Sequence, residues 1–328
     1  TFSTPAHLHE APKGHQVGAT GFFSPDKDPK RKKTIKKLQA RLDRLDQNQP
    51  KTRLWKTECN LRESLSMELY HLEQFDESLN QIAQALFLAK KLEGNNTINL
   101  FFYRGLNYFF KHDDTQAQAA WEQVKEQAGK NPGYGNLHLT YFGLGMIYDM
   151  KKDYAQALAA WQKALEIKPD YHEAWYNMGL AYANAGDYAQ ALAAYQRAVE
   201  IKPDYYEAWN NMGIAYANTG DYAQALEAFQ KAVEIDETDG GLTNLGWLHF
   251  TRQEKEQAKK YFMRDAEVGK EPQYPLMNLG HISLTEGRHR EAERLYRQSL
   301  EQFPDKAQFF EAMEDDWQYL QPYGVKKS

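Results

Sequence analysis

The chain contains 328 residues, of which 42% are hydrophobic, and it carries a formal net charge of −5 at pH 7. This charge gives no general attraction to nucleic acid, whose binding domains are usually basic, so we expect no nucleic-acid partner. Cys59 is the single cysteine, which excludes an internal disulfide, and no run approaches the roughly 18 apolar residues of a membrane span. We expect a cytoplasmic protein. The first residue is Thr rather than Met, which indicates processing or trimming and leaves an exported protein as the alternative.

Residues 1–27 are rich in Gly, Pro, Ser and Thr and show no sustained periodicity, which predicts an extended or disordered segment. His7, His9 and His15 lie in this segment, and histidine is a common metal ligand. A flexible segment does not hold ligands in the fixed geometry that a metal site needs. We therefore expect no metal site and no cofactor.

An amphipathic helix is predicted to start at Asp28-Pro29, a pair typical of helix starts. One stripe of this helix is apolar and comprises Ile35, Leu38, Leu42 and Leu45. The other face is basic and comprises Lys30, Arg31, Lys32, Lys33, Lys36, Lys37 and Arg41. We expect residues 28–58 to form this helix and a linker, with the helix capping the elements that follow and its basic face solvated. The alternative is contact with acidic protein, anionic lipid or nucleic acid.

A unit of about 34 residues recurs between residues 59 and 304. The clearest copy begins at His172 and has, at set offsets, Trp175, Met178, Gly179, Tyr182, Ala191, Tyr195, Ala198 and Pro203. The next copy begins at Tyr206 and has, at the same offsets, Trp209, Met212, Gly213, Tyr216, Ala225, Phe229 and Ala232. Spacings of three and four predict two helices in each copy. Gly186 and Asp187 predict the turn between them, and Pro203 ends the second helix.

This pattern resembles the tetratricopeptide repeat family, with Met in place of Leu before the glycine. The resemblance implies antiparallel helix pairs stacked into a right-handed superhelical solenoid, in which Gly179 and Ala191 let two helices approach closely. We therefore predict an all-α fold with capping helices at both ends. The pattern predicts about seven repeats, which start near residues 59, 98, 138, 172, 206, 239 and 273.

Residues 305–328 are predicted to form a C-terminal capping helix and a tail. The apolar residues of this helix recur at helical spacing and comprise Phe309, Met313, Trp317 and Leu320. A solenoid needs such a cap because its last repeat otherwise leaves an apolar face in water, and the acidic residues 314–316 give the cap a polar exterior.

The resemblance implies a concave groove lined by the first helices of successive repeats, and such grooves bind peptides. Four consecutive repeats have asparagine at the sixth offset, namely Asn177, Asn211, Asn244 and Asn278. An amide offers a donor and an acceptor, so a row of them matches a peptide backbone. The alternative is that these amides bond within the solenoid. Hydrogen bonds alone supply too little free energy for a stable complex, so apolar residues at groove offsets complete the predicted site: Phe142, Met146, Tyr176, Leu180, Ile214, Trp247, Phe250 and Met277.

Charge at the groove offsets indicates the kind of peptide. Members of the family that grip a C-terminal carboxylate do so with Lys and Arg, whereas the charged residues at these offsets are Glu63, Asp149, Glu173 and Glu207. We therefore expect no carboxylate clamp and a peptide that is apolar with neutral or basic flanks.

The sequence contains no nucleophile elbow, phosphate-binding glycine loop, paired cysteines or zinc-protease motif. We therefore expect a non-catalytic scaffold or adaptor that binds a peptide segment of a partner protein. Two alternatives come from other classes. One is a structural protein that self-associates through the aromatic residues of 100–110 or the end helices, and the other is an electrostatic adaptor acting through the basic N-terminal helix.

Overall fold

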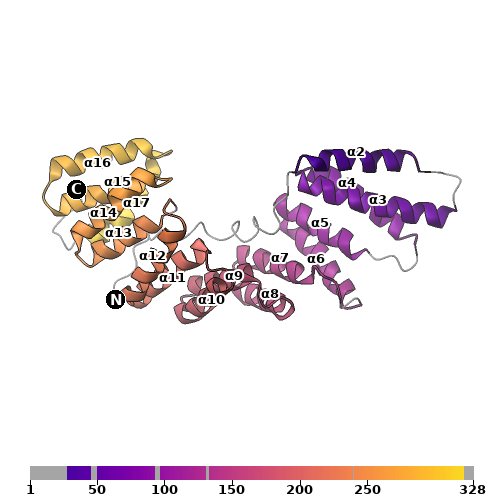
Figure 1. Cartoon of the computed structure of the whole chain (residues 1–328), viewed down its shortest axis with the longest axis horizontal. Coiled ribbons are helices and arrows are strands. Elements are labelled where there is room, and N and C mark those ends of the chain that lie inside the picture. Colours follow the sequence, from indigo (N-terminus) through magenta and orange to yellow (C-terminus); the bar gives the residue numbers. More distant parts are fainter. Residues whose placement is uncertain (1–27, 46–49, 93–96, 131–132, 239, 321–328) are drawn as a thin grey trace. The chain divides into compact units, whose positions relative to one another are not determined.

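The structure is a computed structural model that describes residues 28–45, 50–92, 97–130, 133–238 and 240–320. These residues form sixteen α-helices, and no strand occurs among them (Figure 1). The all-α prediction is therefore confirmed. None of the described helices is long and apolar enough to cross a membrane. The predicted extended segment, residues 1–27 with its three histidines, lies outside the described residues.

The described chain divides into two compact units, with the boundary between Asp170 and Tyr171. The first unit begins with a single helix, α2, and continues with three antiparallel pairs. Its helices are α2 Lys30–Asp43, α3 Lys51–His71, α4 Phe75–Ala89, α5 Ile98–Phe110, α6 Asp114–Ala128, α7 Leu137–Met150 and α8 Tyr154–Ile167.

The second unit contains four antiparallel pairs and ends with a single helix, α17. Its helices are α9 His172–Asn184, α10 Tyr188–Ile201, α11 Tyr206–Thr219, α12 Tyr222–Ile235, α13 Gly241–Thr251, α14 Lys255–Val268, α15 Gln273–Thr285, α16 His289–Gln302 and α17 Lys306–Leu320. In both units each pair packs against the next pair of the same unit, which is the arrangement of a solenoid.

Helix α3 begins at Lys51, whereas the sequence predicted a helix and linker up to residue 58 and a first repeat from residue 59. The helical spacing of buried side chains explains the earlier start, because Leu54, Leu61 and Leu65 lie at intervals of seven and four and all are buried. The first helix of the first repeat is therefore longer than the pattern indicated.

A glycine in the first helix faces an aromatic ring of the second helix in six of the seven pairs. A Cβ atom at Gly213 would lie 2.5 Å from ring carbons of Phe229, and one at Gly179 would lie 2.4 Å from Tyr195. The remaining pair, α3 with α4, has Ser66 and Ile82 at these two offsets, and both residues are buried. Ser66 is larger than the glycine of the other pairs, and Ile82 opposite it is smaller than their aromatic rings.

The turn inside a pair combines a left-handed residue with an aspartate cap. Gly186 has φ 79°, and the Asp187 side chain accepts a hydrogen bond of 3.1 Å from the backbone N–H of Gln190. This confirms the predicted turn, since a positive φ costs glycine little and aspartate is a favoured N-cap. Asp153 caps α8 in the same way, but there the left-handed residue is Lys152, with φ 59°.

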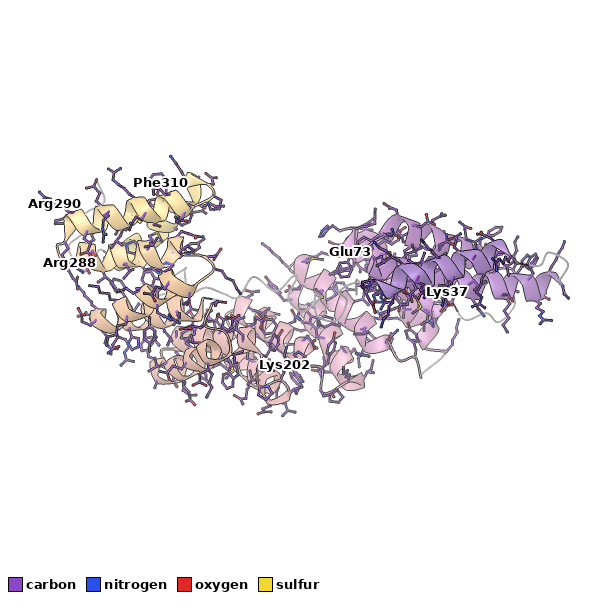
Figure 2. The ribbon with its side chains drawn as sticks, turned by 45° about the horizontal axis from the view of Figure 1, so that its top comes forward. Lys37, Glu73, Lys202, Arg288, Arg290 and Phe310 are labelled. Carbon is purple, nitrogen blue, oxygen red and sulfur yellow. The ribbon has the colours of Figure 1, made fainter. Side chains whose placement is uncertain are left out.

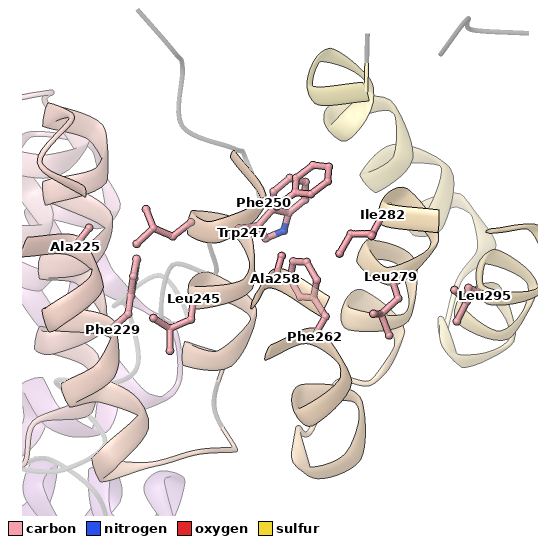
Figure 3. Close-up of a cluster of buried hydrophobic side chains, with 11 residues drawn as sticks. Ala225, Phe229, Leu245, Trp247, Phe250, Ala258, Phe262, Leu279, Ile282 and Leu295 are labelled. Atoms are coloured by element: carbon pink, nitrogen blue, oxygen red, sulfur yellow. The ribbon is translucent and has the colours of Figure 1, made fainter. Parts of the chain in front are cut away.

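Aromatic and branched aliphatic residues from consecutive pairs form the core of the second unit. Figure 3 shows part of this core, in which Phe229 of α12, Trp247 of α13 and Phe262 of α14 are at most 1% exposed. At the C-terminal end, Phe309 and Ala312 of α17 pack with Met277 and Phe303. The side chains of residues 317 and 320, predicted to belong to this apolar face, lie outside the described part.

Candidate functional site

The four predicted groove asparagines lie on α9, α11, α13 and α15, the first helices of the four pairs of the second unit. Asn177 is 3% exposed, Asn211 4%, Asn244 0% and Asn278 3%. The repeat positions each of them one residue before a core residue of its own helix, so their helical register is the same. The row predicted from sequence therefore exists as a set of equivalent, nearly enclosed amides.

Three of these amides use their nitrogen atoms in hydrogen bonds within the second unit. Nδ2 of Asn177 donates to the carbonyl oxygen of Glu173 at 2.8 Å, and Nδ2 of Asn211 donates to the Tyr176 hydroxyl at 3.0 Å. Nδ2 of Asn244 donates to Oδ1 of Asn210 at 2.7 Å. The alternative considered for the sequence, bonding within the solenoid, thus describes the nitrogen side of these three amides.

The side-chain oxygen atoms of three of these asparagines lack hydrogen-bond partners within the described residues. The side-chain oxygens of Asn177 and Asn211 make no hydrogen bond within the described residues. Oδ1 of Asn278 is buried and also lacks a hydrogen-bond partner there. A buried acceptor without a partner costs free energy, so Asn278 retains capacity for a donor.

The predicted apolar contact residues lie mostly in the interior. Six of the eight are at most 2% exposed, namely Phe142, Met146, Tyr176, Trp247, Phe250 and Met277, and Leu180 and Ile214 are partly buried. Phe142 and Met146 belong to the first unit, so the structure assigns the twelve predicted residues to two units. Core packing accounts for the six buried side chains, and their contact with a peptide stays a prediction.

The structure adds partners that the repeat pattern did not single out. Asn210 meets Asn244 across neighbouring helices, and the Tyr176 ring, whose hydroxyl accepts from Asn211, packs 5.0 Å from the Tyr205 ring. Offsets alone do not reveal such bonds, because each joins side chains of two different repeats. The sequence offers one sign of these bonds, which is that the residue directly before the sixth offset, Tyr176 or Asn210, carries a polar group.

A buried polar chain lies at the C-terminal end of the second unit. His281 is 1% exposed; its Nδ1 lies 2.8 Å from the Tyr296 hydroxyl, and its Nε2 lies 2.9 Å from Oδ2 of Asp316, which is 0% exposed. Burial and the neighbouring Asp316 carboxylate raise the pKa of Tyr296 well above its usual value. Asp316 was predicted to face solvent, and this expectation is wrong because the carboxylate pairs with His281 and ties α17 to α15.

Stacked antiparallel helix pairs with glycine opposite aromatic rings define a class, the all-helical repeat solenoids. Models of the tetratricopeptide repeat match residues 176–240 and 276–306, and a further model described as a TPR repeat matches residues 145–186. The chain contains tetratricopeptide repeats within these residues, as the residue pattern indicated.

Several solved structures resemble this chain in fold. BtubC (BKLC) from P. vanneervenii is 17% identical with a TM-score of 0.53, and the match covers 64% of this chain and 92% of that chain. PilW, a type IV pilus biogenesis factor, is 23% identical with a TM-score of 0.51 and coverages of 64% and 96%. Pseudomonas aeruginosa pilF is 16% identical with a TM-score of 0.52 and coverages of 66% and 97%. Comparison with curated proteins gave no significant match. At these identities the likeness shows the fold alone.

Proposed function

We propose that this protein is a non-catalytic interaction scaffold and that the second unit binds a peptide segment of a partner protein along the first helices of its repeats. The observation that carries the proposal is the row Asn177, Asn211, Asn244 and Asn278 on four consecutive first helices. The internal bonds of three amide nitrogens fix the orientation of these side chains. The oxygens of Asn177 and Asn211 remain as acceptors for backbone N–H groups.

The small exposed fractions constrain how a ligand reaches these oxygens. Asn177 and Asn211 expose 3% and 4% of their surface, so contact is restricted to a slender group such as an extended peptide backbone. Each such hydrogen bond contributes only about 0.5–1.5 kcal/mol, so apolar contacts with partly buried residues such as Leu180 and Ile214 must supplement the row. The acidic Glu173 and Glu207 of the first helices favour neutral or basic flanks on the peptide.

A display library of extended peptides, selected on the full-length protein, provides the test. We expect Asn177→Ala and Asn211→Ala each to weaken binding of the selected peptide about 2- to 10-fold, the equivalent of one lost hydrogen bond. Asn107→Ala is the matched control. Asn107 is also buried, its nitrogen also donates to a backbone carbonyl four residues earlier, and it is not a member of the row. Equal affinity of all variants, or an equal loss in the control, would contradict binding at the row.

Self-association through an end helix is a second candidate, favoured by one observation. Phe310 of α17 is 62% exposed and borders an open surface pocket of about 420 Å³ between α15, α16 and α17. The aromatic residues of 100–110 do not favour it, because Phe102 and Phe109 are buried and Phe110 stacks on Phe75. Sedimentation of wild type and Phe310→Ser decides the matter, since a monomeric wild type at high concentration excludes this candidate.

A further inference from the structure

The basic face of α2 consists of seven exposed residues that form no ion pair with any described residue. They are Lys30, Lys32, Lys33, Lys36, Lys37, Arg41 and Arg44, which directly follows the helix. Arg31, the remaining basic residue of α2, pairs with Glu68 of α3 at 2.8 Å. In the other described helices, eight lysines and arginines pair with an acidic residue one turn away, as Lys163 pairs with Glu166. The unpaired charges of α2 are therefore a local concentration in a chain whose net charge is negative.

Five of these residues form a straight row, which we call the basic row: Lys30, Lys33, Lys37, Arg41 and Arg44. Their spacings of three, four, four and three residues place them on one side of the helix. At a rise of about 1.5 Å per residue, the row extends for about 21 Å. Figure 2 labels Lys37, a member of this row, on α2.

The orientation of the basic row is fixed by the packing of the other side of α2. Leu38 is buried against Leu61, Leu65 and Leu69 of α3, and Ile35, Leu42 and Leu45 pack on the same cluster. Rotating the helix would expose these side chains, so the row stays at the surface. The same packing uses the entire apolar stripe of α2, and apart from Pro29 no exposed residue between 28 and 45 is apolar.

We propose that the basic row is a second binding surface, which takes an acidic helical segment of a partner protein. Carboxylates spaced by three and four residues on a helix match the spacing of the row, and opposite charges so aligned steer and orient association. Residues 28–45 include no aromatic side chain on which the bases of a single strand stack. The helix also has no free apolar face to insert into a membrane interface. An acidic helix needs neither feature, and its carboxylates can follow the three- and four-residue spacing of the row.

The test uses the full-length protein and two labelled alanine-based peptides of equal length and equal glutamate number. One has its glutamates in a single helical row, and the other has them distributed around the helix. We expect the row peptide to bind about tenfold tighter in fluorescence anisotropy at low salt, and this preference to decline as salt rises. Equal affinity of the two peptides overturns the proposal, because the protein then senses charge alone.

Two triple variants separate the basic row from total charge. Lys33→Glu/Lys37→Glu/Arg41→Glu reverses the centre of the row, and we expect it to lose the row peptide at least tenfold, since three attractive contacts become repulsive. Lys90→Glu/Lys130→Glu/Lys260→Glu changes the net charge equally at exposed lysines that are not part of α2, and it should bind like wild type. An equal loss in both variants overturns the proposal.

The other classes of partner are outcomes of the same assay. Vesicles containing phosphatidylserine and a single-stranded RNA oligomer are titrated under identical conditions, and tighter binding of either, lost in the row variant, would replace the acidic protein segment as the partner. This surface is independent of the asparagine row. Asn177→Ala and Asn211→Ala should leave binding of the acidic peptide unchanged, so failure of one proposal does not imply failure of the other.

Discussion

Asp265 is a carboxylate enclosed between helices, and its environment makes stability depend on pH. It is 4% exposed, accepts a hydrogen bond from the Thr243 hydroxyl, and burial raises its pKa to about 6. An unfolded aspartate ionises near pH 3.9. The folded state therefore binds this proton more tightly. The stabilisation of the folded state by protonated Asp265 is full below about pH 4 and is lost as pH rises to about 6.

We predict that Asp265→Asn, which keeps the acceptor for Thr243 but cannot ionise, gains stability relative to wild type across this range. The gain should approach at most about 3 kcal/mol near pH 7 and vanish near pH 4. Thermal unfolding of both proteins between pH 4 and pH 8 measures it.

Asp236 is a control of opposite sign. Hydrogen bonds from Thr238 hold the pKa of its carboxyl below the usual value, so Asp236→Asn should be less stable than wild type at neutral pH, with a difference that shrinks in acid. A parallel response of the two variants would contradict both assignments.

The contact between Gly213 and Phe229 leads to a residue-level prediction about packing. Gly213→Ser should lower the free energy of unfolding by about 1–3 kcal/mol, because the new side chain meets the ring. Phe229→Ile leaves a cavity and also destabilises. The double variant should lose less than the sum, since Ser66 and Ile82 coexist at these offsets in α3 and α4. A urea double-mutant cycle measures this coupling, and strict additivity would contradict the compensation.

Individual residues were predictable where the repeat imposes a steric need. Gly179 was expected to lie where bulk is not tolerated, and the structure places the Tyr195 ring against it. The asparagine row was predictable as a row, but the direction of its bonds was not. The partner of Asn244 is Asn210 of the preceding repeat, and such a pair depends on how two helices pack rather than on either one alone.

At the scale of elements, the turns inside the pairs differ in the residue that adopts the left-handed conformation. Gly186 and Gly220 occupy it in the two clearest copies, whereas Lys152 occupies it between α7 and α8. A residue with a side chain destabilises the folded state by about 1–2 kcal/mol in this conformation. Glycine avoids this cost, but its more flexible unfolded state offsets part of the gain.

We therefore predict that Lys152→Gly raises the free energy of unfolding by about 0.5–1 kcal/mol, measured by denaturant titration. Ala185→Gly is the matched control. Ala185 lies at the end of α9 with ordinary right-handed angles, φ −81° and ψ −3°, so glycine there should destabilise by a similar amount. Two changes of the same sign would show that conformation does not decide the effect.

Helix type and pairing were predictable from the spacing of apolar residues, whereas helix ends were not. The turn at Gly186 and Asp187 was identified because glycine and aspartate have specific roles there. The start of α3 at Lys51 was missed, because the repeat pattern marks the packing core of a helix and not the length of its first turns.

At the scale of the whole molecule, α17 closes the C-terminal end of the second unit. Phe309 is 6% exposed and packs with Met277 and Phe303, which would otherwise present apolar surface to water. We predict that Phe309→Asp lowers both the melting temperature and the solubility, because a charge in this contact undocks the helix. The adjacent exposed Gln308 provides the control, since Gln308→Asp introduces the same charge outside the contact. Equal melting temperatures of the two variants would show that α17 does not cap the unit.

The sequence by itself determined the class of fold, because a repeated pattern of apolar spacing, glycine and aspartate specifies local helix pairs, and each pair needs only its neighbours to bury its face. Tertiary structure decided which polar groups are satisfied inside. It paired Asp316 with His281, Asn211 with Tyr176 and Asn244 with Asn210. It also set the division at residues 170 and 171. These features depend on distances between side chains of different helices, which no periodicity along one chain encodes.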